Sequence, residues 1–246
     1  MRSFLEGVVL GIGYFTRLPM PWRVERVHEE SYRAVALTLP FAGLLLGAFS
    51  TALFVLLSGY GDRTFTALLA ATGYLFSYGF LHTEGFVDIV DAWHGGHGGK
   101  DRHTILKDPH IGAIGALWGF GLAAVKIAAM VTLLRMDAYG AVIGALFASR
   151  FAALWLLGRG TLHAASSFAR RMQSQLRGYD LWIVALVGAG VLWAAGTLWM
   201  AVVTGIAAVL LQRWLMRAFG FLNGDGLGFA IEVTETLLLA MAVYLV

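Results

Sequence analysis

The stretch LWIVALVGAGVLWAAGTLWMAVVTGIAAVLL, residues 181–211, contains no charged side chain over its 31 positions. As one α-helix it would be about 46 Å long, whereas the hydrocarbon core of a bilayer is only about 30 Å thick. The stretch therefore predicts two membrane-spanning helices with a break near Gly196 and Thr197. It decides the class of fold, because two such helices side by side belong in a membrane.

Other apolar runs predict five further spans, over residues 34–57, 65–81, 111–134, 138–157 and 227–246. Hydrophobic residues make up 59% of the chain and charged residues 13%, against roughly 25% charged residues in soluble domains. A shorter apolar run, residues 3–15, precedes Pro19 and Pro21 and predicts an interfacial or re-entrant helix. We expect a single all-α integral membrane domain over residues 1–246, a polytopic bundle of about seven transmembrane helices.

The basic residues divide unequally between the two sides of this layout. With residue 1 in the cytoplasm, 14 of the 18 Lys and Arg side chains fall in cytoplasmic segments, and only Arg63 and Arg135 fall opposite. This bias predicts a multi-pass protein of the cytoplasmic (inner) membrane. The net charge of +3 is too small and dispersed to indicate nucleic acid as a partner, so the expected partner is the lipid bilayer. The chain has no cysteine, which excludes thiol catalysis and Cys-based zinc sites.

Two basic side chains, Lys126 and Arg150, lie inside predicted spans. Glu232 and Glu235 in the last span are candidate partners. Charges at this depth are costly unless they are paired. The pattern favours structural pairing between helices, with direct substrate contact by Arg150 as the alternative.

An acidic segment, HTEGFVDIVDAWHGGHGGKDRHTILKDPHIG at residues 82–112, holds five of the 15 acidic residues. If the second span continues as a helix past Leu81, then Glu84, Asp88 and Asp91 share one face, at positions i, i+4 and i+7. Carboxylates gathered this way repel one another unless a hard cation such as Mg²⁺ binds them. The segment therefore predicts metal-assisted phosphoryl transfer at the cytoplasmic face, with Gly85 allowing close approach of a substrate.

Two glycine-rich sequences carry weaker signals. HGGHGGK, residues 94–100, does not fit the spacing of a phosphate-binding P-loop. It favours a flexible linker over a loop that closes on substrate and brings Lys100 to a phosphate. NGDG, residues 223–226, predicts a turn.

The sequence HTEGFVDIVD, residues 82–91, resembles the H-x-D-G-x-x-D-x-x-D motif of the cobalamin synthase family. Further blocks resemble that family in the same order along nearly the whole chain: FTRLPMP at 15–21, LPFAGLLLG at 39–47, LKDPHIG at 106–112, the pair at 149–150 and GDGLG at 224–228. The chain departs from the family pattern where Glu84 replaces the usual Asp and where Pro109 and His110 replace Ser and Arg. Because His110 lacks the planar fork of Arg, it is a weaker phosphate clamp.

This resemblance implies a Mg²⁺-dependent transferase that joins adenosylcobinamide-GDP to α-ribazole or α-ribazole 5′-phosphate. The products are adenosylcobalamin or its 5′-phosphate, and GMP. The expected metal ligands are Glu84, Asp88, Asp91, Asp108 and Asp225. The expected catalytic residues are His82, Asp91 and Lys107, with His82 or Asp91 as the proton acceptor. The expected substrate contacts are Arg17, Gly85, Lys100, His110, Arg150 and Gly224.

Two other functions remain alternatives. A membrane phosphotransferase of the CDP-alcohol type needs a D-G-x-x-A-R pattern, but Gly85 is followed here by Phe86, Val87 and Asp88. A cation-coupled transporter would place its acids near the middle of the membrane, whereas most acids here lie at one face. Assembly as a homo-oligomer, or with other cobalamin-assembly enzymes, is left open by the sequence.

Overall fold

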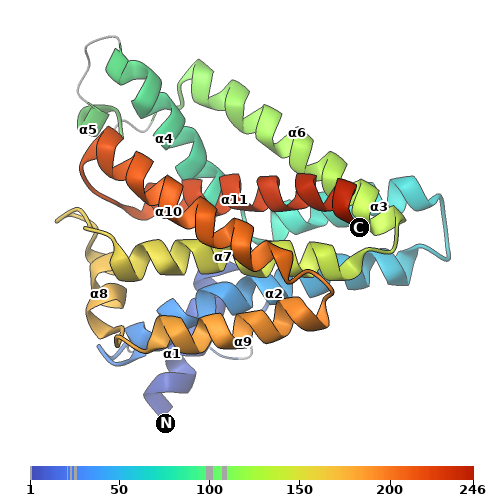
Figure 1. Cartoon of the computed structure of the whole chain (residues 1–246), viewed down its shortest axis with the longest axis horizontal. Helices are drawn as coiled ribbons and strands as arrows, with labels where there is room; N and C mark the ends of the chain where they lie inside the picture. Colours follow the sequence, from blue (N-terminus) through green and yellow to red (C-terminus); the bar gives the residue numbers. More distant parts are fainter. Residues whose placement is uncertain (1, 21, 23, 25–26, 98–101, 107–109) are drawn as a thin grey trace.

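The computed structural model describes residues 2–20, 22, 24, 27–97, 102–106 and 110–246 (Figure 1). Its helices are α1 Arg2–Phe15, α2 Ser31–Leu57, α3 Arg63–Ser77, α4 Leu81–His97, α5 Arg102–Ile105, α6 Ala113–Arg135, α7 Tyr139–Arg159, α8 Ser167–Gln175, α9 Asp180–Ala194, α10 Trp199–Phe219 and α11 Gly224–Leu245. Apart from one isolated bridge between Leu162 and Leu222, the regular structure of the described residues is helical. The predicted all-α class is confirmed.

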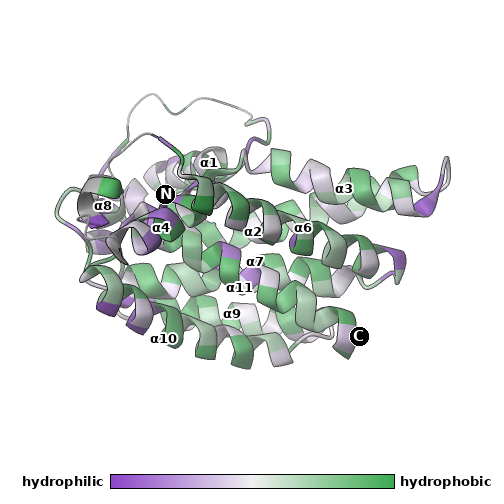
Figure 2. Ribbon diagram, turned by 90° about the horizontal axis from the view of Figure 1, so that it is seen from above, coloured by the Kyte–Doolittle hydropathy of each residue, from purple (hydrophilic) through white to green (hydrophobic). Residues whose placement is uncertain are grey.

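Five helices are long and apolar enough to cross a membrane, namely α2, α6, α7, α10 and α11. Two bent pairs, α3 with α4 and α8 with α9, raise this number to as many as seven. Hydrophobic residues cover most of the helix lengths, and hydrophilic residues concentrate toward the ends of the bundle (Figure 2). The chain is therefore a polytopic helical membrane protein.

Helix α7 lies at the centre and packs against α2, α9, α10 and α11 (Figure 1). Its contact with α2 is close because α2 presents glycines to it. A methyl group added at Gly47 would come within 2.8 Å of Ile143 Cα, and one at Gly43 would meet the backbone of Leu146. Small residues allow such approach between membrane helices, where van der Waals packing drives association.

The break predicted near Gly196 and Thr197 is confirmed. Helix α9 ends at Ala194, Gly196 adopts a φ of +71°, and α10 begins at Trp199. Two antiparallel helices therefore replace the 46 Å helix that the sequence ruled out.

The second predicted span, residues 65–81, is interrupted before Leu81. Helix α3 ends at Ser77, and α4 begins at Leu81 after a bend of 77°. Gly79 and Phe80 adopt φ values of +63° and +58°, which no helix accommodates. The Arg17 side chain packs where a Cβ at Gly79 would lie, and the Arg17 N–H donates to Ser77 O at 2.6 Å.

Two shorter predicted segments are the N-terminal helix and the glycine-rich linker at residues 94–100. The predicted N-terminal helix is present as α1, which ends at Phe15 and packs on α2 through Gly7 and Gly11. The prediction of a flexible linker over residues 94–100 is partly wrong, because α4 continues as a helix through His97. The rest of that linker, including Lys100, lies outside the described residues.

Candidate active site

The candidate site lies where α4 crosses the beginning of α11. A Cβ added at Gly85 would come within 2.8 Å of Asp225 Cα, and one at Gly228 would lie 3.1 Å from His82 O. The close approach that the sequence predicted at Gly85 is therefore an approach by the α11 backbone. Gly85 also lines a pocket beside the crossing.

Asp225 is held at the first turn of α11 by its neighbour Asn223. The Asn223 side chain accepts from the Gly226 N–H at 2.8 Å, which caps the helix, and donates to Asp225 Oδ2 at 2.6 Å. The turn predicted at 223–226 is thus a helix N-terminus, an arrangement that favours an acidic side chain in its first turn.

Helix α4 carries the acidic face that the sequence predicted, and α11 adds Asp225 to it. Asp225 and Glu84 both act electrostatically on Asp88, Asp225 more strongly, and Glu84 acts on Asp225. In the described part of the chain, none of these three carboxylates forms an ion pair with a Lys or Arg side chain. Three carboxylates without a cationic partner fit a hard divalent cation.

The described side chains do not, as they stand, bring three His, Asp or Glu groups close enough to hold one ion. Glu84 is exposed and Asp88 half-buried, so rotation of their side chains is not blocked by core packing. Asp108, the remaining predicted ligand from the loop, lies outside the described residues. The metal site therefore stays a prediction.

Asp91, predicted as a metal ligand and a proton acceptor, accepts two hydrogen bonds from a neighbouring helix. Its Oδ2 accepts from the Gly112 N–H at 2.8 Å, and its Oδ1 accepts from the Gly115 N–H at 2.7 Å. These N–H groups belong to the start of α6, where no side chain of α6 itself provides a cap. Asp91 thus satisfies the exposed end of a neighbouring helix.

A pocket of about 390 Å³ opens between α1, α2, α4, α7, α8 and α11. One part of its lining is polar and includes His82, Glu84, Gly224 and Asp225. The rest is largely apolar and includes Phe15 and Leu39, which belong to the blocks at 15–21 and 39–47. It also includes residues on which the sequence gave no functional signal, such as Tyr14, Phe168, Ala169 and Met172.

Two side chains in this pocket have distinctive polar groups. His82 is 5% exposed, its Nε2 has no hydrogen-bond partner, and its ring stacks on Tyr78 with centroids 5.6 Å apart. Burial, and then the negative charge of Asp225, raise the pKa of the Tyr14 hydroxyl above its ordinary value. Both residues line the pocket, and Nε2 of His82 is itself a buried atom.

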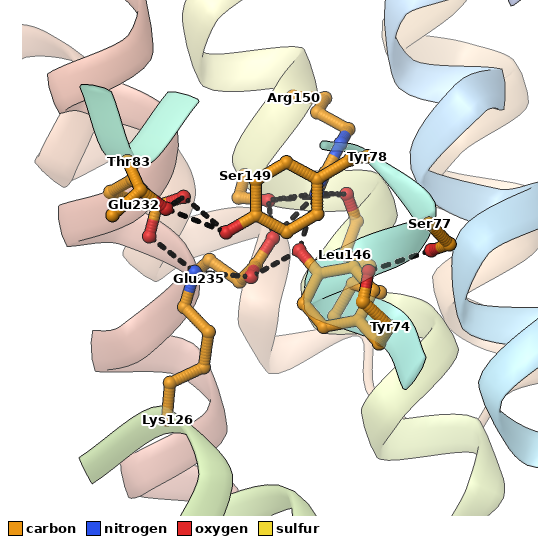
Figure 3. A network of polar contacts seen from close by, with 10 residues as sticks. All are labelled: Tyr74, Ser77, Tyr78, Thr83, Lys126, Leu146, Ser149, Arg150, Glu232 and Glu235. Atoms are coloured by element: carbon orange, nitrogen blue, oxygen red, sulfur yellow. Dashed lines mark hydrogen bonds and ion pairs between the residues drawn. The ribbon is translucent and has the colours of Figure 1, made fainter. Parts of the chain in front are cut away.

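Beneath the site, four buried charges form one network (Figure 3). Lys126 pairs with Glu232 and, at 2.8 Å, with Glu235, while Arg150 Nη1 lies 2.5 Å from Glu235 Oε2. The helix-to-helix pairing favoured by the sequence is confirmed. Arg150 is fully buried here and does not line the pocket.

Hydroxyl groups join this network to the bend between α3 and α4 (Figure 3). Tyr78 Oη donates to Glu232 at 2.9 Å, Thr83 Oγ1 donates to the same carboxylate at 3.1 Å, and Tyr74 Oη donates to Glu235 at 2.5 Å. Because Thr83 directly precedes Glu84, the network also fixes the start of the acidic face.

The remaining predicted contacts are spread more widely. Gly224 lines the pocket, Arg17 packs against the α3–α4 bend, and His110 is exposed just before α6. Lys107 lies outside the described residues.

Comparison with known proteins gives one consistent result. The family model described as cobalamin-5-phosphate synthase matches residues 7–243. The adenosylcobinamide-GDP ribazoletransferase of Geobacillus kaustophilus is 30% identical over 97% of this chain and 95% of its own. The one from Novosphingobium aromaticivorans is 29% identical over 97% of each chain, and the one from Alkalilimnicola ehrlichii is 37% identical over 56% of this chain and 54% of its own. No solved structure matches.

Proposed function

The chain belongs to the cobalamin-5-phosphate synthase family, and from this membership we propose that it transfers the adenosylcobinamide phosphate group of adenosylcobinamide-GDP to α-ribazole or α-ribazole 5′-phosphate. A ribose hydroxyl oxygen forms the new bond to phosphorus, and the bond between the two phosphates breaks. GMP leaves with the electron pair of that bond. The products are adenosylcobalamin or its 5′-phosphate, and GMP.

One observation carries this proposal beyond the family name. Glu84, Asp88 and Asp225 act electrostatically on one another and have no cationic partner among the described residues. Glu84 and Asp225 line a pocket large enough for part of a small organic substrate. Uncompensated carboxylates next to such a pocket fit the handling of a diphosphate through a bound cation.

We assign the metal-holding role to Glu84, Asp88 and Asp225, and Mg²⁺ is the ion that their oxygen atoms fit. A bound Mg²⁺ would neutralise negative charge on the diphosphate. Asp91 is the weakest of the predicted ligands, because both of its oxygens already accept hydrogen bonds from α6. Asp108 remains a candidate from the loop.

Of the two proton acceptors proposed from the sequence, His82 is better supported than Asp91. His82 lines the pocket with an unpartnered Nε2. From that position it would accept the proton of the attacking hydroxyl.

Positive charge for the phosphates is expected from the segment that joins α4 to α6. Lys100, Lys107 and His110 lie in this segment. Arg150 is assigned to the buried network instead, because it is fully enclosed there with Glu235. A positive side chain near the leaving group would stabilise its developing charge.

We place the protein in the cytoplasmic membrane with the pocket facing the cytoplasm. The uneven distribution of Lys and Arg supports this orientation. Residues of α1, α4, α8 and α11 line the pocket, and the parts of these helices that line it lie toward one end of the bundle, which agrees with this orientation (Figure 1).

The direct test is release of GMP by detergent-purified protein incubated with adenosylcobinamide-GDP, α-ribazole 5′-phosphate and Mg²⁺. We expect GMP and the cobalamin product in equal amounts, and neither in the presence of a chelator. The free nucleoside α-ribazole is tested in parallel to decide which acceptor is preferred. Release of CMP from a CDP-alcohol, with no GMP from the corrinoid conjugate, would instead support the CDP-alcohol alternative.

A further inference from the structure

The pocket beside the acidic residues has two chemically different parts. Glu84 and Asp225 stand on its polar side, and His82 also lines the pocket. Its other side is formed by aromatic and aliphatic side chains from α1, α2, α7 and α8. A molecule that fills it must therefore combine an apolar body with a polar end directed at the carboxylates.

The apolar side is suited to a flat ring. The rings of Tyr14 and Phe168 lie 4.6 Å apart between centroids, so α1 and α8 together present an aromatic wall. Ala165 and Ala169 leave space beside it, since neither has a side chain beyond Cβ. Aromatic walls bind planar rings through burial and through offset or edge-on contacts.

We propose that this pocket binds the base of the acceptor nucleoside, the benzimidazole ring of ribazole, and so orients the acceptor for attack. This inference rests on the proposed function and identifies which substrate takes which part of the site. With the ring against Tyr14 and Phe168, the ribose lies on the polar side. Its hydroxyl group then faces His82 and the carboxylates that hold the diphosphate.

The other large groups of the two substrates fit less well. Guanine carries polar atoms on most of its edges, and burial against aliphatic walls would leave them without partners at considerable cost. A corrin macrocycle carrying its amide side chains is too large for about 390 Å³. A benzimidazole has an apolar carbocyclic edge and one free ring nitrogen, which matches a wall with few polar groups.

The absence of cysteine in this chain allows a direct test. Ala169→Cys places a single thiol in the pocket wall, and Ser174→Cys places one on an exposed position of the same helix. Each purified full-length variant is treated with methyl methanethiosulfonate, with α-ribazole, with guanosine or without a nucleoside. Neither Mg²⁺ nor the corrinoid conjugate is added.

At a concentration of α-ribazole about ten times its Kd, labelling of the Ala169→Cys variant should slow about tenfold, because the fraction of protein without ligand is 1/(1 + [L]/Kd). Guanosine at the same concentration should leave the rate unchanged, and the Ser174→Cys variant should react equally fast in every case. Equal labelling of Ala169→Cys with and without α-ribazole would overturn the inference, as would protection by guanosine alone. An Ala169→Cys thiol that never reacts would also overturn it, since the pocket would then be closed.

This experiment separates the inference from the proposed function. If GMP is released while α-ribazole gives no protection, the activity stands and the base binds elsewhere. If α-ribazole protects the Ala169→Cys thiol while no GMP is released under any condition, the pocket is a nucleoside site and the proposed transfer fails.

Discussion

Arg150 on α7 and Glu235 on α11 form a fully buried ion pair, with 2.5 Å between Nη1 and Oε2. Lys126 contributes a second positive charge to the same carboxylate from α6, at 2.8 Å. With Glu232 the network contains two positive and two negative side chains, so its charges balance. Such a set is stable in an apolar surrounding only while every member keeps its partner.

Removing one member alone should therefore be strongly destabilising. We expect Arg150→Met to cost about 3–5 kcal/mol in the free energy of unfolding, because Glu235 loses its closest cation in the interior. The double variant Arg150→Met/Glu235→Gln removes one charge of each sign and should recover most of this loss. Thermal unfolding of the detergent-solubilised variants measures both, and equal stability of the single and double variants would contradict the network as described.

The carboxylates of the site should behave differently from those of the network. We expect Asp225→Asn and Asp88→Asn each to lower Mg²⁺-dependent GMP release by at least about 100-fold, the order of loss when one electrostatic group acting on a transition state is removed. Both should need more Mg²⁺ for half-maximal rate and should unfold at the temperature of the unaltered protein. Asp137→Asn, at an exposed acid outside the pocket, is the matched control. Full activity of Asp88→Asn at the usual Mg²⁺ concentration would remove Asp88 from the metal site.

The crossing of α4 and α11 should tolerate no added atom at Gly85. In Gly85→Ala the new methyl would lie 2.8 Å from Asp225 Cα and 2.9 Å from Asp225 O, so the helices must separate. We expect a loss of about 1–3 kcal/mol in stability, together with reduced GMP release. Gly121→Ala in α6 meets no atom within 4 Å and should be neutral or stabilising by up to about 1 kcal/mol.

Asp91 offers a test that separates a helix anchor from a metal ligand. Loss of a side-chain cap costs about 0.5–2 kcal/mol, and we expect this range for Asp91→Ala. The Mg²⁺ concentration for half-maximal GMP release should stay unchanged, since the carboxylate is bound to α6. Asp62→Ala removes a cap from α3, where Asp62 Oδ1 accepts from the Phe65 N–H at 2.8 Å, and should lower stability without affecting activity. A several-fold rise in the Mg²⁺ requirement of Asp91→Ala would return Asp91 to the metal site.

The sequence predicts the spans well, because a helix in lipid must be both apolar and long enough to satisfy its own backbone. The break at Gly196 and the pairing of Lys126 and Arg150 with Glu232 and Glu235 follow from the same physics. In each case a long uninterrupted helix or an unpaired charge would be too costly in the membrane.

The bend between α3 and α4 and the walls of the pocket were not predictable in this way. Phe80 adopts a positive φ although its residue type gives no sign of one. Tyr14 and Phe168 meet only because α1 and α8 fold to the same end of the bundle. Asp91 shares a helix face with Glu84 and Asp88, and only the position of α6 reveals the hydrogen bonds that it accepts from that helix.

The orientation of the chain in the membrane gives the last prediction. Ser174 lies in α8 beside the pocket, whereas Tyr60 lies in the turn between α2 and α3 and is 90% exposed. Each is replaced by a single cysteine in a chain that has none of its own. A membrane-impermeant maleimide applied to cells with a permeable outer envelope and an intact cytoplasmic membrane should label Tyr60→Cys and not Ser174→Cys. Labelling of Ser174→Cys should require disruption of the cytoplasmic membrane, because 14 of the 18 basic residues predict that this end faces the cytoplasm. The reverse pattern would place the pocket on the outer side of the membrane and would contradict the proposed orientation.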